Sequence, residues 1–271
     1  MTENKEIIYP NIKQSWGIVG IAILAIFLFI PVKVLLQNAT GEGISFFVYS
    51  ILTLGTTFVF AHLIRKKKTG ISQYNFHFSS AKIILLVSFA TITIQVGIIS
   101  PIISIIPMSE SVKDMFLKLS NQGGVFLFIA GVILAPIIEE LIFRGIILDG
   151  LLRRYSPVKS IIVSSILFGI VHLNPWQFIS AVFVGFFSGW VYYKTNNLTL
   201  SILIHLVNNL FGSILMYFID VETSMNDSIP ELYGGYTSYV LIAIGAIMVS
   251  MVCIFLLRIE FKNRIIEKWH I

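Results

Sequence analysis

The feature that most constrains this chain is a series of eight apolar runs, each about as long as a lipid bilayer is thick. A run near 20 residues suits a transmembrane helix, because such a helix crosses about 30 Å of hydrocarbon. Only 12% of the 271 residues are charged, whereas soluble domains are about 25% charged. The sequence therefore predicts an all-α, polytopic integral membrane bundle of about eight transmembrane helices, with a single domain over residues 1–271. The runs cover approximately 17–36, 44–64, 83–107, 123–148, 157–173, 176–193, 198–219 and 237–258.

The distribution of lysine and arginine predicts the orientation of the bundle. If the N-terminus is cytoplasmic, sixteen of the 19 basic residues fall on the cytoplasmic side, and Arg144 is counted among them. The exceptions are Lys33, Lys113 and Lys118. Basic residues gather on the cytoplasmic side of membrane proteins. We therefore expect a multi-pass protein of the plasma membrane with both termini in the cytoplasm. The basic stretch 65–68 then reflects topology, and we expect the lipid bilayer, not nucleic acid, as a partner.

Few ionisable side chains occur inside the apolar runs, and they lie on three of them. A charged group at membrane depth costs about 2.5–3.5 kcal/mol on insertion scales, so such groups point to function. These runs also carry two adjacent asparagines, which are polar without being charged. The candidates are Glu139, Glu140, Arg144, His172 and His205, with Asn208 and Asn209 as uncharged companions.

The spacing of these residues predicts which side chains share a helical face. Glu140 and Arg144 are four residues apart, so their side chains can meet. Glu139 points about 100° away from Glu140, because adjacent helical residues do not share a face. One glutamate can thus be neutralised by the arginine while its neighbour faces a cavity. The same spacing of four separates Phe168 from His172 and His205 from Asn209.

A carboxylate and two imidazoles within a membrane are suited to hydrolysis. Imidazole and carboxylate are common zinc ligands, and a catalytic zinc keeps one position open for water. The metal lowers the pKa of that water toward 7. A second carboxylate can carry a proton to a leaving amine, and an N–H donor can stabilise an oxyanion. Peptide hydrolysis uses all of these groups, although the same side chains can also serve another metal or none.

At these positions the sequence resembles the CPBP family of CAAX proteases and bacteriocin-processing enzymes, also called the abortive-infection family of intramembrane proteases. The family motif EExxxR reads here as Glu139, Glu140 and Arg144. The motifs FxxxH and HxxxN follow in the family's order, within a motif core at about 123–219. They read as Phe168 with His172, and as His205 with Asn209.

The resemblance implies an eight-helix intramembrane metalloprotease that cleaves a membrane-associated peptide or protein, in peptide maturation or bacteriocin self-immunity. It implies that Glu139 activates the water, and that Glu140 and Arg144 support it. It further implies that Asn209 helps to stabilise the oxyanion, while Phe168 packs beside the site. It implies that His172 and His205 bind the metal or orient the water. The expected metal is zinc, and its expected ligands are His172, His205 and Glu139.

Three other interpretations compete with this one. The first is that Glu140 and Arg144 form a structural ion pair and that the histidines are satisfied core residues, as we expect for His62, His77 and His270. The second is a proton-coupled transporter, for which the sequence shows no inverted repeat. The third is a catalytically silent immunity or scaffold protein. Other intramembrane protease classes are disfavoured, because HExxH, GxSG and GxGD motifs are absent.

Overall fold

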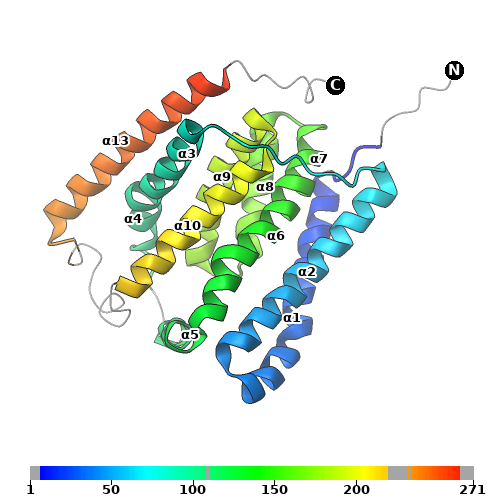
Figure 1. Cartoon of the computed structure of the whole chain (residues 1–271), viewed down its shortest axis with the longest axis horizontal. Coiled ribbons are helices and arrows are strands. Elements are labelled where there is room, and N and C mark those ends of the chain that lie inside the picture. Colours follow the sequence, from blue (N-terminus) through cyan, green and yellow to red (C-terminus); the bar gives the residue numbers. More distant parts are fainter. Residues whose placement is uncertain (1–6, 108–109, 219–230, 232, 263–271) are drawn as a thin grey trace.

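The first half of the bundle consists of an N-terminal helical hairpin and a third span that lies apart from this hairpin. The computed structural model describes residues 7–107, 110–218, 231 and 233–262, and these residues form helices and loops without a strand. A long connection runs from the end of the hairpin across one end of the bundle to the third span (Figure 1). The elements are α1 (Ile12–Thr40), α2 (Glu42–Thr69), α3 (Ala81–Ile94), the π-helical η1 (Gln95–Ile99) and α4 (Ser100–Ile103).

The central span is built from short α-helical and π-helical pieces. Its first helix, α5 (Glu110–Phe128), bends at Gly124, whose φ of 51° is non-helical. Before this bend α5 lies across the lower ends of the other helices, and after it the chain turns into the bundle (Figure 1). Gly124 suits the bend because a glycine adopts a positive φ without strain. The span continues through η2 (Ile129–Leu134), α6 (Ala135–Ile142), η3 (Phe143–Leu148) and α7 (Asp149–Leu152).

Four further helices complete the bundle, and each of the eight predicted runs overlaps a helix. They are α8 (Pro157–Ile170), α9 (Pro175–Thr195), α10 (Leu198–Phe218) and α13 (Tyr236–Phe261). Within the part of the chain that the structure describes, six helical segments are long and apolar enough to cross a membrane, so the protein is a multi-pass membrane protein. The six are Ile12–Thr40, Glu42–Thr69, Ala81–Ile103, Gly124–Leu152, Leu198–Leu215 and Tyr236–Phe261.

The fifth and sixth predicted runs form a shorter hairpin, α8–α9, so the count of eight spans is approximate. The 14 residues of α8 extend about 21 Å at the helical rise, less than a hydrocarbon core of about 30 Å. The two helices pack closely at Gly185, where an added Cβ would lie 2.9 Å from the Ser165 side chain. Asn174 caps α9 by accepting the Gln177 N–H at 2.8 Å. The turn between the two helices contains His172.

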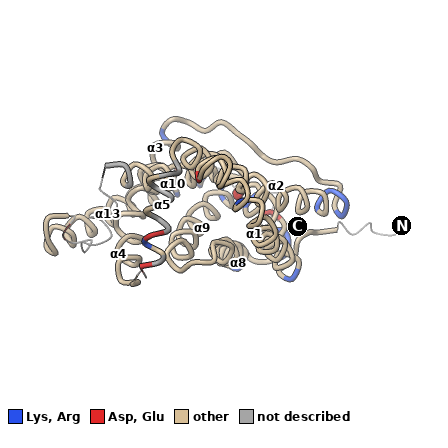
Figure 2. The backbone as a smooth tube through the Cα atoms, turned by 90° about the horizontal axis from the view of Figure 1, so that it is seen from below, with Lys and Arg blue, Asp and Glu red and all other residues tan. Residues whose placement is uncertain are grey.

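The two ends of the described chain lie at the same side of the bundle. In Figure 1, α1 begins and α13 ends at the same edge, which agrees with an even number of crossings. At the opposite edge Lys33, one of the three basic exceptions, pairs with Glu42 at 2.8 Å. Figure 2 shows how few charged positions the bundle contains overall. Which edge faces the cytoplasm stays a prediction. Residues 219–230 and the tail with His270 lie outside the described residues.

Candidate active site

The motif-bearing helix is held to α10 by a backbone carbonyl that a proline leaves without a helical partner. In the π-helical segment η2, the Ala135 N–H bonds to the carbonyl of Ala130, five residues back. The next donor in this pattern would be Pro136, which has no N–H. The carbonyl of Gly131 instead accepts the side-chain amide of Asn209 at 2.8 Å. This bond joins the central span to α10 next to the predicted site.

Glu140 is a fully buried carboxylate that three helices satisfy together. Its Oε1 atom accepts the Arg144 guanidinium at 2.8 Å, which confirms the pairing that the spacing predicted. The same oxygen lies 3.1 Å from Nδ1 of His205, on α10. Its Oε2 atom accepts the Ser188 hydroxyl of α9 at 3.0 Å. A buried charge is tolerated when it is paired and hydrogen-bonded, so Glu140 is neutralised in place.

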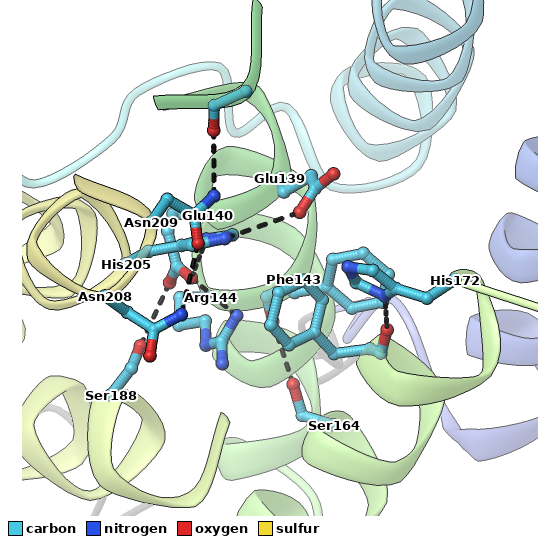
Figure 3. A network of polar contacts seen from close by, with 12 residues as sticks. Glu139, Glu140, Phe143, Arg144, Ser164, His172, Ser188, His205, Asn208 and Asn209 are labelled. Atoms are coloured by element: carbon cyan, nitrogen blue, oxygen red, sulfur yellow. Dashed lines mark hydrogen bonds and ion pairs between the residues drawn. The ribbon is translucent and has the colours of Figure 1, made fainter. Parts of the chain in front are cut away.

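Glu139 has a different environment from its neighbour. Its side chain is 13% exposed and lines a cavity of about 530 Å³. The carboxylate lies 3.8 Å from Nε2 of His205. Figure 3 shows Glu139 directed away from the Glu140–Arg144 pair. A partly hydrated carboxylate beside an imidazole can accept a proton from water.

The ring of Phe168 organises the side chains around it. It meets the His172 ring edge-on at 5.2 Å and the His205 ring edge-on at 5.3 Å between centroids. The Arg144 guanidinium lies over the same ring at 4.6 Å from its centroid. The Phe168 side chain therefore packs beside the site, and its ring contacts both imidazoles.

The hydrogen bonds of the two imidazoles indicate which ring nitrogen carries the proton and which has a free lone pair. Nδ1 of His172 lies 3.0 Å from the carbonyl oxygen of Phe168, and Nδ1 of His205 contacts the Glu140 carboxylate. A carbonyl and an ionised carboxylate only accept hydrogen bonds, so each Nδ1 carries the proton. In the neutral form each ring then has a lone pair on Nε2. Both histidines line the cavity that Glu139 also lines.

The two asparagines hold each other in place. The Asn208 amide donates to Oδ1 of Asn209 at 3.2 Å, and Asn209 in turn donates to Gly131. Both residues line the cavity. An amide has two N–H groups, so Asn209 retains one donor beyond the bond to Gly131. That donor is the group available for the predicted oxyanion role.

The predicted zinc ligands have side-chain chemistry that suits a metal site. Histidines that bind metals usually donate their other ring N–H to a carboxylate or carbonyl, as His172 and His205 do here. Across the part of the chain that the structure describes, however, no three His, Cys, Asp or Glu side chains are placed to hold one ion. Zinc binding by Glu139, His172 and His205 stays a prediction, and no chemical step below depends on it.

The structure corrects one assignment and adds residues that the motifs do not include. Arg144, counted among the basic residues of the cytoplasmic side, is 0% exposed inside the bundle. Ser188 donates a hydrogen bond to Glu140, although it belongs to none of the three motifs. The hydroxyl side chains of α2 line the cavity, and their spacing of three to four residues was visible in the sequence. His62 contacts the Tyr74 hydroxyl at 2.8 Å, away from the site.

Comparison with known proteins gives a match to one family model over the motif-bearing region, and matches to relatives over about a third of the chain. Residues 121–211 match the family model described as "Type II CAAX prenyl endopeptidase Rce1-like". The chain is 33% identical over 94 residues to "UPF0177 protein YxdF" of Lactococcus lactis subsp. lactis (strain IL1403), a match covering 34% of this chain and 51% of that protein. No solved structure matches significantly.

A second relative carries a functional name. The chain is 33% identical over 94 residues to "Putative membrane peptidase YdiL" of Bacillus subtilis (strain 168), a match covering 35% of this chain and 38% of that protein. The chain thus spans about half or less of the length of the curated relatives that it matches. The region that matches the family model, residues 121–211, contains all three motifs together with Arg144, Ser188 and His205, which contact Glu140. Over this central region, the chain is similar to CAAX-type membrane endopeptidases.

Proposed function

We propose that this protein is an intramembrane endopeptidase in which Glu139 activates the attacking water. The observation that carries the proposal is the difference between the two adjacent glutamates. Glu140 is fully buried and bonded to Arg144, whereas Glu139 is partly exposed to a cavity that both histidines line. A general base must be near water and must be able to change its charge, and only Glu139 meets both conditions.

The proposed reaction begins with a water molecule between Glu139 and the substrate carbonyl. Glu139 takes a proton from the water as the oxygen forms a bond to the carbonyl carbon. The negative charge moves to the carbonyl oxygen, where the remaining N–H of Asn209 can stabilise it. The C–N bond then breaks, and Glu139 returns its proton to the leaving amine. The products are a carboxylic acid and an amine, which become a carboxylate and an ammonium group when the acid passes its proton to the amine, and the glutamate recovers its charge.

His205 and His172 orient the reactants in this scheme. Nε2 of His205 lies on the Glu139 side of its ring, at 3.8 Å from the carboxylate, where it can accept a hydrogen bond from the water. The contact between Nδ1 of His205 and Glu140 stabilises any positive charge that the ring acquires. Arg144 and Ser188 keep the Glu140 carboxylate in position for this contact. His172 provides a second unprotonated nitrogen on the cavity wall.

The membrane setting supports a membrane-associated peptide or protein as the substrate, with the lipid bilayer as the second partner. A role in peptide maturation or bacteriocin self-immunity belongs to this proposal, as does a plasma-membrane location with cytoplasmic termini. The name of the Bacillus subtilis relative, "Putative membrane peptidase YdiL", supports the reaction type. Zinc remains part of the proposal as the expected metal.

The proposal is tested with purified protein reconstituted in lipid nanodiscs and a library of short, internally quenched peptides. Mass spectrometry should show new N-termini with the wild-type protein and none with the Glu139→Gln variant. Intact peptides with both proteins would contradict proteolysis. Uptake of a solute into proteoliposomes, without cleavage, would support the transporter interpretation instead.

The metal is tested separately on the same preparations. We expect one zinc ion per wild-type protein molecule. The His172→Ala and His205→Ala variants should contain none. Full activity in a metal-free preparation would reject zinc and would leave the role of Glu139 intact.

A further inference from the structure

The inward face of α2 is polar, although the helix lies in an apolar bundle. Large apolar side chains of the same helix, such as Ile51, Phe60 and Leu63, are exposed and therefore available to lipid. A transmembrane helix with polar residues facing inward lines either a polar contact or a hydrated space. The buried residues of α2 are small or polar throughout: Glu42, Gly43, Ser45, Ser50, Thr53, Thr57, Ala61 and Arg65.

Three aliphatic hydroxyl groups of this face line the cavity that Glu139 also lines. They belong to Ser50, Thr53 and Thr57, and the larger side chains of Phe46, Tyr49 and Leu54 line the cavity beside them. Each hydroxyl donates its proton to the backbone carbonyl one turn earlier, at 2.8 Å for Ser50, 2.9 Å for Thr53 and 2.8 Å for Thr57. A hydroxyl that has donated its only proton still has lone pairs that accept hydrogen bonds. This wall of the cavity therefore offers hydrogen-bond acceptors.

The backbone bonds of these hydroxyls do not by themselves indicate a binding site, because serine and threonine often make them inside helices. Thr91 of α3 makes the same bond, to the carbonyl of Val87 at 2.8 Å, and is equally buried. Thr91 does not line the cavity. The distinguishing feature of the α2 hydroxyls is thus that they line the same cavity as a carboxylate and two histidines, a space that can hold a ligand.

The spacing of the acceptors suits an extended peptide. Thr53 and Thr57 are one turn apart, about 6 Å along the helix axis. In an extended chain the N–H groups on one edge belong to every second residue, about 6.6 Å apart. The carbonyl of the residue between them points to the opposite edge. A peptide bound to α2 through its N–H groups would therefore turn the intervening carbonyl away from α2, into the cavity that Glu139 lines.

We propose that the inner face of α2 is the wall that binds the backbone of the substrate, with the hydroxyl oxygens of Thr53 and Thr57 accepting N–H groups of an extended peptide. Ser50 lies at the next acceptor position toward the α1–α2 turn. This inference rests on the proposed peptidase function and adds to it the residues that position the peptide. Because the contacts involve backbone groups, the wall selects for an extended conformation and not for particular side chains.

The kinetic test uses threonine-to-valine variants, which keep the shape of the side chain and remove the acceptor. With the quenched peptide that the wild-type protein cleaves fastest, Thr53→Val and Thr57→Val should each raise KM about threefold to tenfold, the equivalent of one hydrogen bond. The kcat value should stay within about twofold, and Thr53→Ser should restore KM. Thr91→Val is the matched control, and its KM should equal that of the wild type. Unchanged KM values for both α2 variants would overturn the proposal.

A modified substrate tests the hydrogen bond itself. Replacing one backbone amide of the peptide by an ester removes a single N–H group. For the wild-type protein, we expect esters at alternate positions near the cleavage site to raise KM. For the Thr53→Val variant, the ester at the position that binds Thr53 should not raise KM further, because the hydrogen bond is already lost. Equal ester effects in both proteins would place the N–H groups elsewhere and overturn the proposal.

A labelling experiment separates failure of this inference from failure of the proposed function. The protein contains a single, buried cysteine, Cys253, so Thr53→Cys and Thr91→Cys can be made in a Cys253→Ser background. A water-soluble thiol reagent should label only Thr53→Cys, and the peptide library should slow this labelling. If no peptide is cleaved but labelling is slowed, the peptidase function fails and the binding wall stands. If labelling is not slowed, the wall fails even where cleavage occurs.

Discussion

Two buried acidic residues on the central span have nearly the same partners and different consequences. Glu140 bonds to an arginine four residues later and to the Ser188 hydroxyl of α9. Asp149 likewise bonds to an arginine four residues later, Arg153, at 3.2 Å. It also accepts the Tyr192 hydroxyl of α9 at 3.2 Å, one turn after Ser188. The span therefore repeats one arrangement of acid, arginine and hydroxyl at two levels of the bundle.

The difference lies in what stands next to each acid. Asp149 adds a second arginine, Arg65 of α2, at 3.5 Å, and so joins helix ends at the terminal side of the bundle. Glu140 adds the imidazole of His205, which extends toward Glu139 and the cavity. The comparison teaches that the same ion-pair arrangement occurs both with and without a cavity beside it. In the proposed function, the reacting group is the carboxylate beside the Glu140 pair, Glu139, which lines the cavity.

The largest effect that separates the two levels is expected for Glu139→Gln. Loss of the general base should lower kcat/KM about 10²–10⁴-fold. The midpoint of thermal unfolding in detergent should stay close to that of the wild type, because the side chain is partly exposed and its removal leaves no buried charge unpaired. Peptide cleavage and thermal unfolding on one preparation check both parts. A variant that unfolds early would instead give Glu139 a structural role.

A large loss of stability is expected when Arg144 is replaced by methionine. The change leaves the Glu140 carboxylate buried without its main partner, which should destabilise the protein by about 3–5 kcal/mol. The double change of Glu140 and Arg144 to leucine and methionine removes both charges and should recover most of that stability. Activity should not return in the double variant, because His205 then lacks its carboxylate. Reversible unfolding in mixed micelles measures the difference, and recovered activity would contradict the supporting role of Glu140.

A smaller effect is expected for Asp149→Asn at the other level. Arg65 and Arg153 lose their shared carboxylate, but Arg153 is partly exposed, and water can compensate in part. We expect a loss of about 3 kcal/mol, at the lower end of the range for broken buried pairs. The kcat/KM of the folded fraction should equal that of the wild type. A selective loss of activity would show that the two levels are coupled.

The smallest effects are expected for the two hydroxyls of α9. Ser188→Ala and Tyr192→Phe each remove one hydrogen bond to a carboxylate, so each should cost about 1.5 kcal/mol of stability, as for bonds to charged groups. Only Ser188→Ala should also reduce kcat/KM, since Glu140 positions His205. Equal kinetic effects of both changes would remove the functional distinction between the levels.

Sequence reasoning predicted the helical class and the pairing within one helix, because both depend on local periodicity. The Glu140–Arg144 contact follows from a spacing of four, and the separate direction of Glu139 follows from a spacing of one. The bond from Asn209 to Gly131 also has a local cause in Pro136, although only the structure identifies the donor that satisfies the freed carbonyl.

Contacts between helices were not predictable in the same way. Ser188 belongs to no motif, and nothing in the sequence places α9 against Glu140. The α8–α9 hairpin was predicted as two spans because its apolar runs are nearly long enough, whereas the 14 residues of α8 are not. The polar face of α2 was visible as a repeat of hydroxyl residues, but its facing the cavity depends on how α1 and α2 pack.

The central claim is that Glu139 activates water and does not itself attack the substrate. A single turnover of the cleaved peptide in H₂¹⁸O, with excess reconstituted protein, tests this most directly. We predict that the new carboxyl terminus contains one ¹⁸O atom and that Glu139→Gln gives no product. A first-turnover product without ¹⁸O, with the label in the Glu139 side chain, would show direct attack by the glutamate and would contradict the account.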